Sequence, residues 1–350
     1  MPRLCFDYDS VCYAVGFAAE TRSIVATHKN SKDSWTFTNR TEFYGRDKKG
    51  GWLEEMNLLR DSPWLPEEFD IQDVQEAKPI ALAREILNYK IRSVVKHLHA
   101  KEWYGYLGKE KSFRHNVATI LEYKGGKRKE NLKPLLLPQI TEMILKEHNG
   151  KVATHRLEAD DWLSIDSYDA WKDWSKTKSD RHRLIAITED KDHLQCTGHF
   201  FNPDKMVLPE SVQGFGKLFW RDDTAKPTLS GRGRLWLVAM CLAGDKADHY
   251  KPCELATYPD SNKKVAFGDV ATYNLLAHCQ DDKEALTALV TQYKAWYPSP
   301  VEYTSWRGEK MTKNWLEIAE EMWQLARMKR WVGDDVSLQE VLNAVGVQLS

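Results

Sequence analysis

The 350-residue sequence lacks the features that mark several common classes of protein. It has no run of about 18 apolar residues, so no segment is predicted to span a bilayer. The start, MPRLCFDYDS, has no basic segment followed by an apolar one, which argues against secretion. The six cysteines are far apart and include no CxxC pair, so neither a disulfide framework nor a zinc ribbon is predicted. We expect a cytoplasmic protein with reduced cysteines.

The sequence also has almost no net charge. It contains 50 basic and 51 acidic residues, a balance of −1, which does not by itself indicate a nucleic-acid partner. The charge is unevenly distributed, however, because basic residues gather in the segment YKGGKRKENLK at 123–133. Taken alone, such a segment is more simply interpreted as a solvated loop.

Short apolar runs alternate with segments of helical spacing along most of the chain. PRLCF and HRLIAIT are strand-like, whereas IALAREILNYK and PLLLPQITEMILKEH have the spacing of amphipathic helices. This alternation predicts an α/β fold with a mostly parallel central sheet flanked by helices. We expect a core at 1–254 with an insertion at about 21–80 and a basic segment at 112–134, followed by a helical C-terminal region at 255–350.

Acidic residues follow or border apolar runs at four separate places in the sequence. They are Asp7 and Asp9; Glu158, Asp160 and Asp161; Asp190 and Asp192; and Asp245 and Asp248. One such group is explained by the preference for acidic residues in the first turn of a helix. The preference does not readily explain the same placement at four separate places. The carboxyl ends of parallel strands meet at one edge of a sheet, so we expect the four groups to converge there. Crowded carboxylates normally require a compensating cation.

The residue types favour a magnesium-like ion. Carboxylate oxygens select Mg²⁺ or Mn²⁺, and the sequence has no histidine and cysteine spacing typical of zinc. Two such ions about 4 Å apart are the usual arrangement for cleaving phosphodiester bonds. A bare acidic pocket would repel a polyanion, so positive groups such as those of the segment from Lys124 to Lys133 must attract the substrate. The sequence therefore predicts a phosphodiesterase with two carboxylate-held metals.

Several of these motifs resemble the 5′ nuclease superfamily of flap endonucleases and 5′–3′ exonucleases, and within it the exonucleases of small lytic podophages look most similar. The matching stretches are FRHNVATILEYKGGKRKENLKP, EADD, TEDKD and AGDKAD. The similarity covers about residues 1–20 and 104–280, and more weakly 315–335. It implies a PIN-like nuclease core, two Mg²⁺ or Mn²⁺ ions, and a DNA-binding role for the region 255–350.

The resemblance also implies roles for individual residues. Asp7, Glu158 and Asp160 match the first-metal carboxylates, and Asp245 and Asp248 match the second-metal pair. Asp161, Asp190 and Asp192 match residues shared around the metals, and Asp9 has a counterpart in the phage exonucleases. The candidate catalytic residues are Lys124, which is expected to contact the scissile phosphate, and Arg128. The expected DNA-binding residues are Arg114, Tyr123, Lys124, Lys127, Arg128 and Gly268, with Tyr123 either stacking on the terminal base or packing inside the protein.

Three features depart from the family pattern. An aspartate expected shortly before Phe113 is missing, and Glu110 is the only acid nearby. The glycine-rich turn that grips DNA after the last acidic pair keeps only Gly268 and Ala271. The insertion at 21–80 has no counterpart that we can place.

The expected function is a metal-dependent 5′–3′ exonuclease that acts on double-stranded DNA in phage replication, in the host cytoplasm, and also removes RNA primers or flaps. Its expected partners are duplex DNA with 5′ ends, RNA–DNA hybrids or flaps, and phage replication proteins, with no membrane. A structure-specific flap endonuclease is the neighbouring alternative. The alternative from another class is a non-catalytic DNA-binding replication scaffold, which the missing aspartate favours.

Overall fold

The computed structural model describes residues 1–47, 49–108, 111–126, 132–222, 226–258, 261 and 263–349. The chain divides into two compact units. The first comprises Met1–Ser10, Ser93–Leu132 and Ile144–Ser350, and the second comprises Val11–Arg92 and Lys133–Met143. Within the described ranges, no helix is long and apolar enough to cross a membrane.

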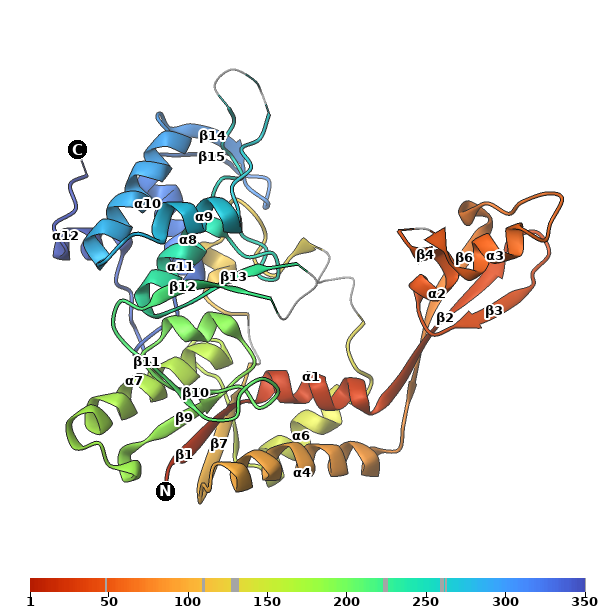
Figure 1. Ribbon diagram of the computed structural model, residues 1–350, viewed down its shortest axis with the longest axis horizontal. Coiled ribbons are helices and arrows are strands. Elements are labelled where there is room, and N and C mark those ends of the chain that lie inside the picture. The colour runs from red at the N-terminus through yellow and green to blue at the C-terminus, as the bar shows by residue number, and fades with distance from the viewer. Residues whose placement is uncertain are drawn as a thin grey trace. The chain divides into compact units, whose positions relative to one another are not determined.

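A six-stranded sheet forms the centre of the first unit, in the order β11-β10-β9-β1-β7-β8 (Figure 1). Five of its strands are parallel: β1 (Arg3–Asp7), β7 (Glu102–Leu107), β8 (Gly150–Val152), β9 (Leu184–Ile187) and β10 (Gly198–Phe201). The edge strand β11 (Glu210–Val212) pairs antiparallel with β10. This topology confirms the predicted α/β fold with a mostly parallel sheet.

The central strands β1 and β9 are short apolar runs that are buried on both faces. Every residue of β9 is buried, as are four of the five residues of β1. Such runs are typical of strands covered by helices on both sides of a parallel sheet. Phe6 pairs with Ile187, so the two strands end at the same level and their following residues meet at one edge.

Several helices come between the strands of this sheet in the sequence. The helix α7 (Ala159–Thr177) packs on β1, β7, β9 and β10. The helices α1 (Tyr8–Ala18), α4 (Ile80–His97) and α6 (Leu137–Glu147) each contain a boundary between the two units. Shorter helical segments are α5 (Arg114–Val117), η3 (Asp180–His182) and η4 (Lys191–Gln195).

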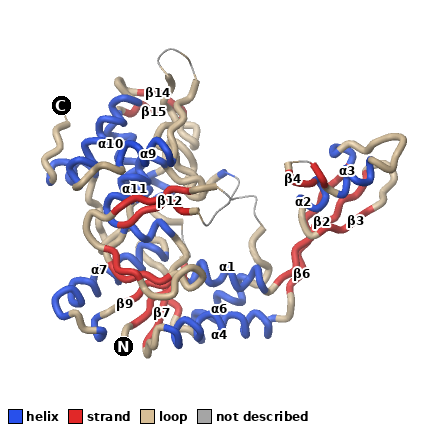
Figure 2. The backbone as a smooth tube through the Cα atoms, viewed as in Figure 1, coloured by secondary structure: helices blue, strands red, loops and turns tan. Residues whose placement is uncertain are grey.

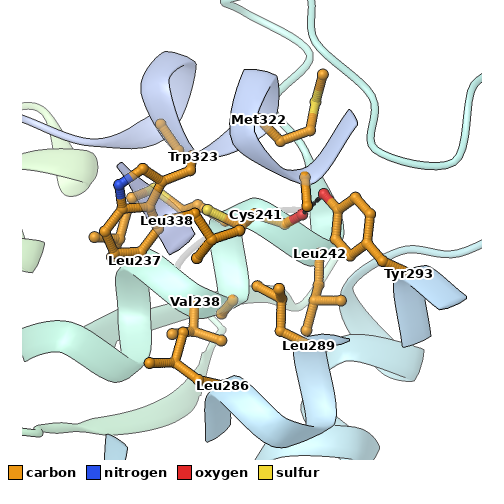
Figure 3. Close-up of a cluster of buried hydrophobic side chains, with 14 of the residues drawn as sticks. Leu237, Val238, Cys241, Leu242, Leu286, Leu289, Tyr293, Met322, Trp323 and Leu338 are labelled. Carbon is orange, nitrogen blue, oxygen red and sulfur yellow. Dashed lines mark hydrogen bonds between the residues drawn. The ribbon is translucent and has the colours of Figure 1, made fainter. Parts of the chain in front are cut away.

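The C-terminal part of the first unit surrounds a second hydrophobic core. Its apolar centre is α8 (Gly233–Ala243), and α9 (Asp269–Leu276), α10 (Asp282–Trp296), α11 (Trp315–Ala326) and α12 (Leu338–Ala344) contribute further side chains. Figure 3 shows Val238 and Leu242 of α8 facing Leu286 and Leu289 of α10. The helical character predicted for this region is confirmed, but a hairpin of β14 (Val301–Thr304) and β15 (Lys310–Lys313) interrupts it. A further hairpin, β12 (Lys217–Arg221) with β13 (Thr228–Arg232), precedes α8.

Most of the second unit is a small domain-like segment with its own sheet. The strands β2 (Glu20–His28), β3 (Ser34–Phe37) and β6 (Phe69–Ala77) form an antiparallel sheet in the order β3-β2-β6 (Figure 2). The remaining elements are α2 (Arg40–Tyr44), β4 (Gly45–Arg46), β5 (Lys49–Gly50), α3 (Trp52–Asn57) and η1 (Pro66–Glu68). Its core is largely aromatic, with Phe37, Phe43 and Phe69 buried and Trp35 and Trp52 packed against them.

The two ends of this segment lie side by side. Glu20 pairs with Ala77 at the base of the sheet, and the Lys78 amide donates a hydrogen bond of 2.9 Å to the Ala19 carbonyl. The segment between them therefore leaves and rejoins the chain at one place, as an insertion does.

We expect that replacing residues 21–76 with a two-residue Asn-Gly turn leaves the rest of the chain folded. The deletion removes the whole aromatic core of this segment, so no part of that core is left exposed. The free-energy cost of loop closure changes by only about 0.6 kcal/mol for each doubling of loop length. Circular dichroism during thermal unfolding should still show one cooperative transition. Loss of that transition would mean that the sheet of 20–77 is required for the fold of the remainder.

Candidate active site

Three of the four acidic groups lie at the carboxyl-terminal edge of the parallel sheet or next to it. Asp7 is the last residue of β1, and Asp190 follows the neighbouring strand β9. Glu158 is the N-cap of α7, which packs on both strands and carries Asp160 and Asp161 in its first turn. Topology therefore brings together side chains that are up to about 180 residues apart in the sequence.

The fourth group reaches the same edge through α8. This helix packs against η4, the segment that begins directly after Asp190. Asp245 and Asp248 follow the end of α8 in a tight turn, in which one Asp245 oxygen accepts hydrogen bonds from the Ala247 and Asp248 amides. Asp245 and Asp248 consequently face the residues that follow β9.

A first group of carboxylates is made of Asp7, Asp9 and Asp160, in which Asp7 and Asp160 interact with Asp190 and Asp9 interacts with Asp7. Asp7 is only 4% exposed, and burial raises its pKa, as does the charge of Asp190. Burial and then the charge of Asp7 raise the pKa of Asp9 to about 7. Burial, followed by the charges of Asp7 and Asp190, raises the pKa of Asp160 well above its usual range. These carboxylates are thus close enough to resist ionising together.

A second group is made of Asp192, Asp245 and Asp248, and it also interacts with Asp190. Burial raises the pKa of Asp192 well above its usual range, and the charges of Asp190 and Asp245 add to the effect. The pKa of Asp190 is itself raised, first by burial and also by Asp245. Asp190 therefore interacts with carboxylates of both groups.

The donor atoms in the two groups suit a hard divalent cation. In the first group, the buried Asp160 Oδ1 has no hydrogen-bond partner among the described residues, whereas the buried Asp192 Oδ1 of the second group lies 3.5 Å from the Lys191 ammonium. Burying the Asp160 oxygen unpaired costs free energy, and Mg²⁺ and Mn²⁺ prefer oxygen ligands. In the part of the chain that the structure describes, no three histidine, cysteine or acidic side chains are yet close enough to hold an ion. A cation would therefore bind here only after side chains move to bring a full ligand set together.

Asp161 is occupied by other partners. Arg114 donates two hydrogen bonds to its carboxylate, at 2.7 and 2.9 Å, and the backbone amides of Glu158 and Lys329 donate to it at 3.0 and 3.1 Å. The Asp161 side chain is fully buried. In this geometry Asp161 caps α7 and has no oxygen directed at the two carboxylate groups.

Arg114 is buried inside the protein. Its guanidinium also bonds to Glu158 at 3.2 Å and to the carbonyls of Leu325 and Arg327 at 3.0 and 2.8 Å, and it is only 3% exposed. The structure therefore places the guanidinium, assigned above to DNA, among carboxylates and carbonyls. Arg114 holds the start of α7 against the end of α11 and the residues that follow it.

Tyr123 and Lys124 both contact Glu158. The buried Tyr123 hydroxyl lies 2.9 Å from carboxylate oxygens of both Glu158 and Asp248 and can donate its one proton to either, so its ring is packed inside the protein and does not present a face for stacking. The Lys124 ammonium lies 2.6 Å from the other Glu158 oxygen. Burial would raise the pKa of Glu158, but Arg114 and Lys124 outweigh it and hold the pKa at about 2.

The backbone turn at Lys124 fixes the position of its side chain. Lys124 has a φ of 53°, and its amide donates to the Asp248 carbonyl at 2.9 Å. The next residues pack tightly, because a Cβ at Gly125 would lie 2.7 Å from the Glu122 carbonyl and 3.0 Å from His249. His249 in turn contacts the Glu122 carbonyl through Nδ1 at 2.9 Å. The turn is therefore anchored on the residues around Asp248.

Lys191 is a candidate that the sequence analysis did not identify. Its ammonium lies 3.5 Å from Asp192 and 3.6 Å from Asp245, and 5.2 Å from the centre of the Trp236 ring. Burial would lower its pKa, but these carboxylates and Asp190 raise it. The sequence feature that could have identified Lys191 is its position between Asp190 and Asp192 in the stretch TEDKD.

The other expected residues are not part of this cluster. Lys127, Arg128 and Glu110 lie outside the described residues. Gly268 is the N-cap of α9, with an extended backbone and open space where a Cβ would be, so neither conformation nor packing there requires glycine.

No family model and no curated protein matches the chain. Among solved structures, the T5 D15 protein co-crystallised with metal ions matches with a TM-score of 0.40 and 14% identity, over 71% of this chain and 82% of that one. A lysine-to-alanine mutant of T5 5′-exonuclease matches with a TM-score of 0.38 and 14% identity, over 71% and 81%. Similarities at this level carry no argument about function.

We expect Arg114→Met to lower the free energy of unfolding by about 3–5 kcal/mol, because it leaves the Asp161 carboxylate buried without its cation. Urea denaturation measures the change. The matched control is Arg181→Met, at an exposed arginine of the same unit, where the change should stay within about 0.5 kcal/mol. Equal stability of the two variants would show that the Arg114–Asp161 pair does not support the fold.

Proposed function

We propose that the chain is a metal-dependent 5′–3′ exonuclease that hydrolyses phosphodiester bonds of double-stranded DNA, with RNA primers or flaps as further substrates. The observation that carries this proposal is the pair of buried carboxylate groups that both interact with Asp190. Each group offers oxygen ligands, and Asp160 Oδ1 in the first is buried without a hydrogen-bond partner among the described residues. Phosphodiester cleavage by two cations uses two neighbouring sites of this kind.

The ligand set that we propose follows the two groups. Asp7 and Asp160, with Glu158, would hold one Mg²⁺ or Mn²⁺ ion, Asp192, Asp245 and Asp248 would hold the other, and Asp190 would serve both. Cations bound there would lower the pKa of an attacking water and neutralise charge on the departing oxygen. Asp9, the third member of the first group, is not assigned to either ion, because its Oδ2 accepts a 2.9 Å hydrogen bond from the Gly108 amide.

Lys124 is the residue that we assign to the scissile phosphate. Its side chain is 31% exposed, so solvent and substrate can reach the ammonium, whereas Arg114 is shut inside the protein. The ammonium bonds to Glu158 and stays charged, because the charges of Glu158, Asp248 and Asp160 outweigh the effect of burial and raise its pKa. A phosphate oxygen can replace Glu158 as its partner, and this exchange frees Glu158 for a cation.

The polarity and the duplex substrate rest on the motif resemblance. The stretches EADD, TEDKD and AGDKAD resemble the 5′ nucleases, and these stretches carry the carboxylates described above. We propose a role in phage DNA replication on the same basis, and the proposal extends to replication proteins as partners.

Metal binding should be measurable without any cleavage. We expect Mg²⁺ or Mn²⁺ to stabilise the chain by about 2.7 kcal/mol at a concentration 100 times the dissociation constant, because only the folded state presents the ligands together. The melting temperature with cation, compared with EDTA, reports this effect. Asp190→Asn should remove most of it, whereas Asp169→Asn, at an exposed position of α7, should not. Equal metal-induced shifts in both variants would rule out Asp190 as a ligand.

Cleavage should depend on the same residue. A duplex labelled at one 5′ end is expected to release short labelled products with Mg²⁺ and none with EDTA. We expect Asp190→Asn to reduce the rate by about 100-fold or more, since several kcal/mol of charge stabilisation is lost, while DNA binding is retained. Asp169→Asn should cleave normally. A single cut at a junction, instead of stepwise release, would favour the flap endonuclease.

A non-catalytic DNA-binding scaffold is the second candidate. It is favoured by the ion pairs of Glu158 with Lys124 and of Asp161 with Arg114, which leave no three described ligands close together. Tight DNA binding with neither metal-induced stabilisation nor cleavage would establish this function instead.

A further inference from the structure

A cavity of about 370 Å³ opens beside Asp190. This volume is within the range of small-ligand pockets, which is about 300–1,000 Å³. The end of β9 and the start of η4 form one wall through Thr188, Asp190 and Lys191. The cavity thus shares Asp190 with both carboxylate groups, but most of its lining comes from other elements.

The opposite wall is one face of the β12–β13 hairpin. Successive side chains of a strand point to opposite faces. On β12, Leu218 and Trp220 pack against the helical C-terminal core, whereas Phe219 and Arg221 line the cavity. On β13, Leu229 is buried in the same core, while Ser230 and Arg232 line the cavity. One face of the hairpin stabilises the fold, and the other presents an aromatic ring, a hydroxyl and two guanidinium groups.

The lining combines an apolar surface with cations. Leu194, Phe200, Met206 and Phe219 supply the apolar part. Lys191, Lys205, Arg221 and Arg232 supply positive charge, and Arg232 bonds to Glu210 with its guanidinium 4.8 Å from the Phe219 ring centre. The acidic lining residues are Glu189, Asp190 and Asp222. A ligand with a flat apolar part and a phosphate matches this combination better than an inorganic anion does.

We propose that this cavity receives the 5′-terminal nucleotide of the strand being cut and retains it as the released nucleoside 5′-monophosphate. The proposal rests on the proposed exonuclease function for the direction of cutting. With the terminal base on the apolar surface and its own 5′-phosphate on the cations, the next phosphodiester is directed towards Asp190. Hydrolysis there adds the water oxygen to phosphorus and breaks the bond to the 3′-oxygen. The terminal nucleotide leaves with a 3′-hydroxyl, and the shortened strand keeps a new 5′-phosphate.

Direct binding of the product tests this assignment independently of cleavage. Equilibrium dialysis with radiolabelled dTMP, in EDTA and again in Mg²⁺, measures the affinity of the full chain, and unlabelled thymidine and inorganic phosphate serve as competitors. We expect one saturable site that dTMP occupies at least tenfold more tightly than either competitor. Phe219→Ala and Arg221→Gln should each weaken dTMP binding at least tenfold. Arg234→Gln, at an exposed arginine outside the cavity, should leave it unchanged.

Each other outcome overturns a defined part of the proposal. If the chain cleaves the labelled duplex but binds no dTMP in either buffer, the nucleotide assignment is wrong and the proposed function stands. If the chain neither cleaves the labelled duplex nor binds dTMP, the proposed function and the nucleotide assignment are both wrong. If phosphate competes as well as dTMP, the cavity is an anion site and not a nucleotide site. Should Phe219→Ala fail to melt cooperatively, Arg221→Gln decides, because it removes a charge without removing the aromatic ring.

Discussion

Repulsion between buried carboxylates is the constraint on which the rest of this structure depends. Two unit charges 4 Å apart interact by about 4 kcal/mol at an effective dielectric constant of 20, and the whole fold is stabilised by only about 5–15 kcal/mol. Asp7, Asp160, Asp190 and Asp192 are brought together by the sheet topology and by α7, so their charges must be compensated. The raised pKa values of these carboxyl groups reflect the repulsion, and the nearby ammonium groups of Lys124 and Lys191 offset part of it.

The three cations that meet these carboxylates differ in how readily they can be exchanged. Arg114 is 3% exposed and its guanidinium bonds to two carboxylates and two carbonyls, so it is a fixed part of the fold. The side chains of Lys124 and Lys191 are 31% and 40% exposed and contact carboxylates at the open side of the cluster. A phosphate or a metal ion can therefore displace the two lysines without disturbing Arg114. The fixed cation supports the fold, and the two exchangeable cations suit ligand binding.

The sequence predicted the strands β1 and β9, the helices α4 and α6 and the clusters of acidic residues, because each depends on local pattern. Each of these patterns is visible within a few consecutive residues of the sequence. Partners that are far apart in sequence were not predictable in this way. Nothing near Arg114 indicates that its guanidinium bonds to carbonyls more than 200 residues later, and Lys191 gains its surroundings from Asp245. The β14–β15 hairpin was also missed, since its buried contacts, such as the hydrogen bond between Tyr303 and Thr119, come from another part of the chain.

The segment after α11 is part of the frame of the site, although it contributes no carboxylate to it. The carbonyl of Leu325, in the last turn of α11, and that of Arg327, just after it, accept bonds from Arg114, and the Lys329 amide donates to Asp161. This segment is itself fixed by Asp334, which is buried and bonds to Arg327 and Arg330. Burial would raise the pKa of Asp334, but hydrogen bonds from these arginines outweigh it and hold the pKa at about 2, so the carboxylate stays charged at neutral pH. Asp334 therefore positions Arg327, and the Arg327 carbonyl holds Arg114. Arg114 in turn holds Asp161 at the start of α7, where Glu158 and Asp160 meet the other carboxylates.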